Sequence, residues 1–165
     1  MIGNRLVIGL LMFAVALVLP HRAAFAQAKP DLTGTWVLNY DRSGRGISGN
    51  SPDVVFPSQL DIKQSATDLS VRRTSVRQAP FSATYKLNGS KINVEAPAGI
   101  TETAEAKFEG ADLVISYRRA FATPAGDMVT DFKEVWTLNG NVLTVKKTVT
   151  QEGDSTTESA VYEKS

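Results

Sequence analysis

Hydrophobic and polar residues alternate along most of this chain. From Thr33 onward, apolar residues recur at every second position in short runs, and no window shows the 3.6-residue spacing of an amphipathic helix. Alternation is typical of strands that have one face against a core and the other in water. The first expected strand is Thr33–Asn39, with Trp36 and Leu38 in one phase, and the last is Thr157–Glu163.

Four hairpin-like units lie between those two strands, each with two alternating segments around a short polar turn. The turns are Ser65–Asp68, Asn88–Ser90, Glu109–Asp112 and Asn139–Asn141. Two of the turns contain Asn-Gly, a pair that adopts the positive φ angles of tight hairpin turns. The pattern therefore predicts about ten strands, one opening, eight in hairpins and one closing.

An even number of strands lets the last strand pair antiparallel with the first, which removes exposed sheet edges. We therefore expect an all-β protein that forms a single antiparallel up-and-down β-barrel of about ten strands. A two-sheet β-sandwich is the alternative, because alternation alone does not separate the two architectures.

The N-terminal segment has the form of a signal peptide. A short basic segment precedes the apolar run Leu6–Leu19, and Ala24–Ala26 matches an A-x-A cleavage site. The run is shorter than the roughly 18 residues of a membrane-spanning helix. We expect residues 1–26 to be removed, with cleavage after Ala28 as the alternative. Residues 27–165 would then form one periplasmic or secreted domain, with no membrane span after cleavage.

Composition excludes several kinds of chemistry. The chain has no cysteine, and its only histidine, His21, lies in the expected signal peptide. The exported domain therefore cannot form a disulfide, a thiolate nucleophile, a Ser-His-Asp triad or a histidine-containing metal site. The whole chain has 18 Lys and Arg against 17 Asp and Glu, a charge too balanced for binding nucleic acid through bulk electrostatics. No metal or cofactor is expected.

Three short motifs resemble those of lipocalin-like (calycin) barrels. Gly34-Thr35-Trp36 looks like the G-x-W signature at the start of the first strand, and Thr130-Asp131-Phe132 is similar to the T-D-Y element before a late strand. The ending Val161-Tyr162-Glu163-Lys164 is similar to that of secreted bacterial lipocalin-like proteins. The resemblance implies a ligand-holding barrel in which the first long connection, here Asp41–Pro57, overhangs the open mouth.

Three expected strands carry an apolar stripe that ends in a cation on the same face, since residues two apart in a strand share a face. The stripes are Leu69–Arg73, Leu113–Arg119 and Leu143–Lys147. Because these strands run in the same direction, the cations lie at one rim with Tyr117 and the connection Asp41–Pro57. Two interpretations stay open: the cations extend into water at the sheet edge, or they form a mouth that binds an anionic head group.

The expected function is non-enzymatic binding of a small amphipathic, anionic ligand in the barrel cavity. The expected ligand contacts are Arg73, Tyr117, Arg119, Lys147, Trp36, Ile115 and Trp136. The first four would hold the acidic head, and the other three would line the cavity. The further lining residues are Leu69, Val71, Phe108, Leu113 and Val145. For the two tryptophans, packing inside the barrel is the alternative role.

Two other functions are compatible with the sequence. A protein-binding or envelope module would have a filled barrel and exposed aromatic residues at the rim, such as Phe56, Phe81 and Phe121. A carboxylate-dependent hydrolase would need two acids in one site. The candidate pairs are Glu102 with Glu105 and Asp131 with Glu134. These acids lie at expected strand ends and turns, where acids are usually solvated, so catalysis is the less favoured function.

Overall fold

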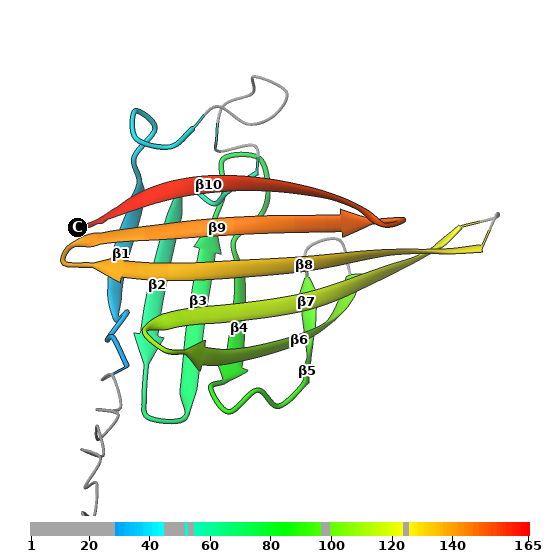
Figure 1. Cartoon of the computed structure of the whole chain (residues 1–165), viewed down its shortest axis with the longest axis horizontal. Helices are drawn as coiled ribbons and strands as arrows, with labels where there is room; N and C mark the ends of the chain where they lie inside the picture. The colour runs from blue at the N-terminus through cyan, green and yellow to red at the C-terminus, as the bar shows by residue number, and fades with distance from the viewer. Residues whose placement is uncertain (1–28, 45–51, 53–54, 97–99, 124–125) are drawn as a thin grey trace, which may run out of the picture.

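The computed structural model describes residues 29–44, 52, 55–96, 100–123 and 126–165, and it consists of ten antiparallel strands (Figure 1). The strands are β1 (Gly34–Leu38), β2 (Gln59–Gln64), β3 (Asp68–Thr74), β4 (Phe81–Lys86), β5 (Ile92–Ala96), β6 (Ile100–Glu109), β7 (Asp112–Thr123), β8 (Gly126–Asn139), β9 (Val142–Gln151) and β10 (Asp154–Lys164). The expected signal peptide lies outside the described residues, as do residues 45–51 and 53–54 of the first long connection. Within the described part of the chain, no helix has the length and apolar character needed to span a membrane.

The first and last strands pair, as the sequence predicts. The sheet order is β4-β3-β2-β1-β10-β9-β8-β7-β6-β5, and every neighbouring pair is antiparallel. Trp36 of β1 stands opposite Lys164 of β10, and Leu38 stands opposite Tyr162. The prediction of an all-β, ten-stranded, up-and-down antiparallel barrel is therefore confirmed, with one departure at the two ends of the sheet.

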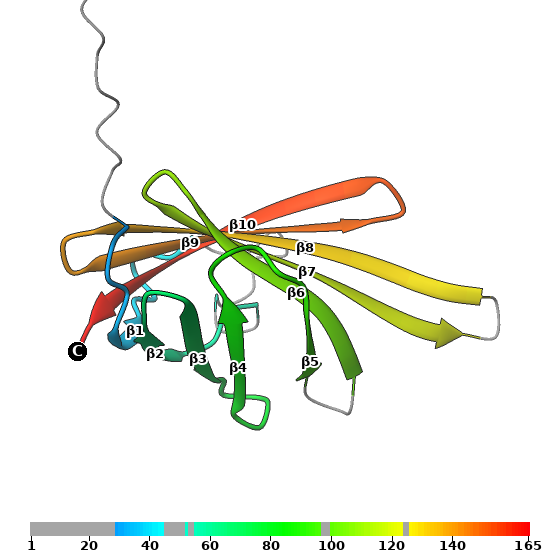
Figure 2. The ribbon, with the colours of Figure 1, turned by 90° about the horizontal axis from the view of Figure 1, so that it is seen from below.

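The departure is a seam between β4 and β5, which form the two ends of the strand order (Figure 2). The prediction of a hairpin through Asn88-Gly89-Ser90 is wrong. Gly89 does adopt a positive φ of 81°, but the backbone here bonds to other strands. The Leu87 N–H donates to the carbonyl of Thr67, and the Gly89 N–H donates to that of Ala106. Thr67 lies in the turn before β3 and Ala106 lies in β6, so these bonds hold residues 87–89 between that turn and β6. β4 and β5 are therefore not paired, and the barrel is nearly closed.

Large apolar side chains fill the interior on one side of the sheet. The largest fully buried ones are Trp36, Trp136, Tyr162, Leu32, Leu60, Leu69, Leu113, Ile115, Leu143 and Val71. The Trp36 indole N–H donates to the carbonyl oxygen of Leu32 at 2.9 Å, so its polar atom is satisfied inside the core. Burial of each such side chain stabilises the fold by roughly 1.5–3 kcal/mol.

Gly34, the glycine of the G-x-W motif, occupies a position where any other side chain is disfavoured. Gly34 has a φ of 141°, and a Cβ added there would lie 2.6 Å from Cε of Lys164. The Lys164 ammonium in turn lies 5.4 Å from the centroid of the Trp36 ring. The lysine stem therefore crosses the glycine to reach the indole, and this contact joins the first strand to the last.

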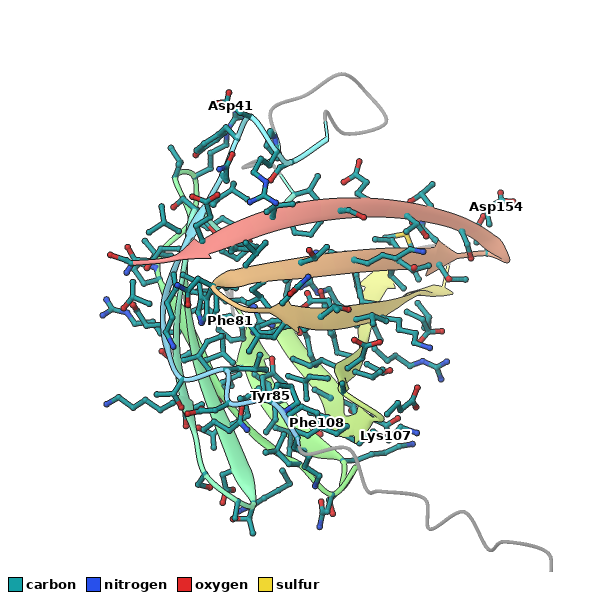
Figure 3. The ribbon with its side chains drawn as sticks, turned by 60° about the vertical axis from the view of Figure 1, so that its left-hand side comes forward. Asp41, Phe81, Tyr85, Lys107, Phe108 and Asp154 are labelled. Atoms are coloured by element: carbon teal, nitrogen blue, oxygen red, sulfur yellow. The ribbon has the colours of Figure 1, made fainter. Side chains whose placement is uncertain are left out.

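Strands β6 to β10 are longer than β1 to β5, and β7 to β10 extend past the other strands (Figure 1). Asp154 marks the outer tip of the β9–β10 hairpin (Figure 3). On the outer face of this region, Arg118 of β7 binds Asp131 of β8 through two hydrogen bonds of 2.7 and 2.8 Å, with side chains 65% and 47% exposed. The inner face of the same strands carries the site described next.

Candidate functional site

A cavity of about 370 Å³ lies inside the barrel, between β3 and β4 on one side and β6 to β9 on the other. Phe81 and Tyr85, labelled in Figure 3, belong to its β4 wall. Residues 55–57, the end of the first long connection, also line it. The volume falls within the range of about 300–1,000 Å³ typical of small-molecule sites.

Four of the seven predicted contacts come together in this cavity. Arg73, Tyr117, Arg119 and Lys147 all line it, and they come from β3, β7 and β9. The other three, Trp36, Ile115 and Trp136, are 0–1% exposed and are not among the lining residues. The further lining residues predicted on the apolar stripes are also absent from the cavity wall and belong to the core or pack against it; these are Leu69, Val71, Phe108, Leu113 and Val145. The polar residues of the predicted site therefore line the cavity, whereas its apolar residues pack in the core.

Glu134 is the centre of a buried hydrogen-bond network. Its carboxylate lies 3.2 Å from Nη2 of Arg73, and it accepts hydrogen bonds from the Tyr117 hydroxyl at 3.2 Å and from the Trp136 indole at 3.0 Å. Nη1 of Arg73 also donates to the hydroxyl of Tyr85 at 2.9 Å. The side chains of the Arg73–Glu134 pair are 12% and 8% exposed, so little water reaches this pair.

The charges of this network set the protonation of its members. Burial alone would raise the pKa of Glu134, but the positive charges of Arg73 and Lys147 outweigh it and hold that pKa below its usual range. Burial, reinforced by the negative charge of Glu134, raises the pKa of Tyr117 well above its ordinary value. Glu134 is therefore an ionised acceptor, and Tyr117 is a neutral donor to it.

A second buried pair joins β6 to β7. Glu102 and Arg119 stand opposite each other in the register, and Nε of Arg119 donates to Oε1 of Glu102 at 2.8 Å. Nη2 of Arg119 contacts the same oxygen. The Glu102 side chain is 7% exposed and that of Arg119 is 29% exposed. This pair neutralises a second arginine of the cavity wall.

Among the described residues, Lys147 is a half-buried cavity cation without a carboxylate partner, whereas Arg77, which also lines the cavity, is exposed. In the described part of the chain, the Lys147 ammonium makes no hydrogen bond and no ion pair, and its recorded contact is the Phe132 ring at 5.3 Å from the centroid. Burial lowers its pKa, and the charges of Arg73 and Arg119 act in the same direction against the attraction of Glu134. A partly buried ammonium that lacks an acceptor is unusual, because burying an unpaired charge is costly.

Phe132 forms an aromatic platform between the cations. Its ring stacks on that of Tyr117 with centroids 4.6 Å apart and planes at 9°. The Arg119 guanidinium and the Lys147 ammonium each lie 5.3 Å from the centroid of the same ring. Such cation–π contacts orient the two charges, but they leave the hydrogen-bond donors of Lys147 unsatisfied.

The expectation that Glu102 and Glu134 are solvated at strand ends is wrong. Both residues are 6% exposed, because Glu102 shares the inward face of β6 with buried Ala104, and Glu134 shares that of β8 with buried Trp136. The spacing contains a signal that could have revealed this: Glu134 is two residues from Trp136 and shares its inward face. Asp131, in contrast, faces outward in the ion pair with Arg118.

Two of the three aromatic residues expected at an exposed rim are covered. Phe56 is 4% exposed, and Phe81 is half-buried and packs against the core. The side chain of Phe121 lies outside the described residues. Within the described part of the chain, no cluster of three or more potential metal ligands of the His, Cys, Asp or Glu types occurs.

Solved structures with a similar fold include a secretory abundant heat soluble protein from Ramazzottius varieornatus, with a TM-score of 0.60 and 15% identity over 85% of this chain and 99% of that one. A protein described as the REP1-NXSQ fatty acid transporter matches with a TM-score of 0.56 and 11% identity, covering 81% of this chain and 96% of that chain. The zebrafish ileal bile acid-binding protein complexed with cholic acid matches with a TM-score of 0.55 and 13% identity, covering 81% and 98%. At such identities the similarity shows the fold alone, an antiparallel up-and-down β-barrel.

A luciferase domain from the dinoflagellate Lingulodinium polyedrum also matches, with a TM-score of 0.50 and 12% identity over 81% of this chain and 41% of that one. Proteins with this fold thus include an enzyme domain as well as binding proteins, so the site must decide the function. No protein-family model and no curated protein sequence matches the chain.

Proposed function

We propose that this protein is a non-enzymatic binding protein that holds a small amphipathic, anionic ligand in its barrel cavity. The observation that carries the proposal is Lys147, a cavity-lining ammonium that has no acceptor among the described residues. An anionic head group would supply that acceptor through a charge-assisted hydrogen bond, which is stronger in a partly dry site.

The charge balance of the cavity supports an anion over a cation or a neutral compound. Glu134 neutralises Arg73, and Glu102 neutralises Arg119, so the charge of the half-buried Lys147 remains, and the exposed Arg77 adds a second positive charge to the lining. Apolar and aromatic side chains also line the cavity and would contact the tail of the ligand. These residues are Val55, Phe56, Phe81, Phe132 and Val149.

The known ligands of two structural neighbours support the same class of compound. One neighbour is described as a fatty acid transporter, and the other was solved with cholic acid. Both descriptions name acids with a large apolar part. The low sequence identity means that they support a class of ligand for this chain and no particular compound.

The test is fluorescence titration of the purified protein with dodecanoic acid and with methyl dodecanoate. Trp136 donates to Glu134, which lines the cavity, so its emission reports on the occupied site. Replacing Lys147 with methionine (Lys147→Met) should weaken binding of the acid roughly 10- to 100-fold, which corresponds to a charged hydrogen bond of about 1.5–3 kcal/mol. Binding of the ester should not change.

The neighbouring residue provides the matched control. Lys146 is exposed on the opposite face of β9, so Lys146→Met removes the same charge outside the cavity and should leave both affinities unchanged. An equal loss for acid and ester in Lys147→Met, or no saturable binding of either compound, would refute the proposal. A filled barrel that binds other proteins would then be the better account.

We further propose that the protein is exported, to the periplasm or beyond, as a lipocalin-like barrel. The support is the sequence of residues 1–26, with its apolar run and A-x-A site. A chain without cysteine also suits an oxidising compartment, because it has no thiol to mispair.

A further inference from the structure

We propose that Lys147 is also a covalent attachment site, at which its amino group condenses reversibly with a long-chain aldehyde held in the cavity. The geometry points to this residue because its side chain lines the cavity, has no carboxylate partner among the residues that the structure describes, and places its nitrogen over the ring of Phe132. The inference extends the proposed function, since the same cavity must admit an apolar chain. It adds a second class of ligand, carbonyl compounds, to the anionic one.

The surroundings of Lys147 favour the free amine, which is the nucleophilic form. The charged groups near it are Arg73 on β3, Glu102 on β6, Arg119 on β7 and Glu134 on β8, and Glu158 of β10 stands opposite it in the register. Both acids of the cavity wall are already engaged by arginines. Burial and the two guanidinium charges lower the pKa of Lys147, so a larger fraction is unprotonated near neutral pH.

Two exposed lysines, Lys86 and Lys107, are paired with carboxylates. Lys86 pairs with Asp68 at 2.5 Å, and Lys107 pairs with Glu109 at 2.9 Å. The ion pair with Glu109 raises the pKa of Lys107 and so favours its unreactive ammonium. Lys147 should therefore react faster than these residues at neutral pH.

The reaction needs no oxidant, reductant or metal. The nitrogen lone pair of Lys147 forms a bond to the carbonyl carbon, and the carbonyl oxygen takes up a proton to give a carbinolamine. Loss of that hydroxyl with the remaining amine hydrogen releases one water and leaves a carbon–nitrogen double bond. Glu134, ionised and opposite Lys147 in the β8–β9 register, can accept the proton from nitrogen through one water molecule and return it to the departing hydroxyl by the same route.

The experiment incubates the purified protein with dodecanal and sodium cyanoborohydride at neutral pH, and then measures intact mass and maps the modified peptide. We expect one dodecyl group per chain, on Lys147, attached at least about tenfold faster than at any exposed lysine, because the cavity holds the aldehyde beside a lysine whose pKa is lowered. Excess dodecanoic acid should slow the labelling, because it occupies the same cavity. Labelling spread evenly over exposed lysines such as Lys107, or an unmodified Lys147, would overturn the inference.

Two variants separate this inference from the proposed function. Lys147→Arg keeps a cation but removes the amine that forms the imine, so it should lose the labelling. Lys146→Met should behave as the unmodified protein does in both assays. If dodecanoic acid binds and Lys147 stays unlabelled, the covalent site alone is refuted; if Lys147 is labelled and dodecanoic acid does not bind, the anionic ligand alone is refuted.

Discussion

Replacing Glu134 with glutamine tests whether a buried ion pair holds the cavity wall together. Glu134 is contacted by Arg73, Tyr117 and Trp136. Glutamine has nearly the same shape and can still accept one or two of these hydrogen bonds. It removes the negative charge, however, and leaves the guanidinium of Arg73 in a site where its side chain is 12% exposed.

The expected loss follows from that uncompensated charge. Breaking a buried pair by removing one partner costs about 3–5 kcal/mol. Because glutamine keeps part of the hydrogen bonding, we expect Glu134→Gln to lower the free energy of unfolding by about 3 kcal/mol, near the lower end of that range. Urea unfolding at pH 7, followed by tryptophan fluorescence, measures this change.

The Arg118–Asp131 pair on the outer face of the same strands provides the control. Its two hydrogen bonds are shorter than the 3.2 Å Arg73–Glu134 contact, but its side chains are exposed. Asp131→Asn should therefore have a much smaller effect, since water and salt screen exposed pairs. If Glu134→Gln costs no more than Asp131→Asn, burial does not strengthen the inner pair and the reasoning fails.

The cost of Glu134→Gln should also depend on pH. In the folded state the pKa of Glu134 lies below its ordinary value of 4.5. At pH values between the two pKa values, Glu134 is therefore ionised in the folded protein and mostly protonated in the unfolded chain. The stabilisation is therefore fully present above pH 4.5 and is lost as the pH falls toward the folded pKa. The difference between the two proteins should be constant above this value and shrink below it.

Two further predictions concern the ends of the chain. Gly34→Ala should destabilise the protein by about 1–3 kcal/mol, because alanine is strained at this φ and its Cβ meets the stem of Lys164. No change in the free energy of unfolding, measured with urea, would contradict this prediction. Adding Lys164→Ala to the same chain should restore only the part of the lost stability that comes from the contact with the lysine stem. Sequencing of the exported protein should give Gln27 as its first residue; membrane-bound material that retains Met1 would show that the apolar run is an anchor.

The strands could be predicted from sequence because their signal is local. Residues two apart share a face, so alternation within a few residues already gives the strand, its inward phase and the number of strands. The seam could not be predicted in this way. The Asn88-Gly89 pair has the local chemistry of a hairpin turn, but bonds from Leu87 to Thr67 and from Gly89 to Ala106 decide where the chain continues. Those partners are distant in sequence, and no turn motif encodes them.

The cations of the site could be predicted because alternation along a strand shows which side chains point inward. The inward phase identifies Arg73, Arg119 and Lys147 as side chains of one face, and the meander brings them together. The partner of Arg73 is Glu134, 61 residues away, and alternation carries no information on such a pair. The sequence predicts that the apolar stripes line a cavity, but in the structure they pack in the core. Alternation shows which side chains point inward, and it does not show whether space remains between them.

The two halves of the interior explain why the cavity lies where it does. Leu, Ile, Val and Trp side chains have no directional requirement and fill the space between the sheet halves. Ion pairs need fixed distances and angles, so the network around Glu134 and Glu102 leaves space that apolar packing would close. Within that network a methionine at the position of Lys147 would avoid the cost of desolvating an unpaired ammonium. Lys147 therefore costs stability in an empty barrel. The cost is offset in a barrel whose ligand carries a carboxylate that pairs with the ammonium, or a carbonyl carbon that reacts with the amine.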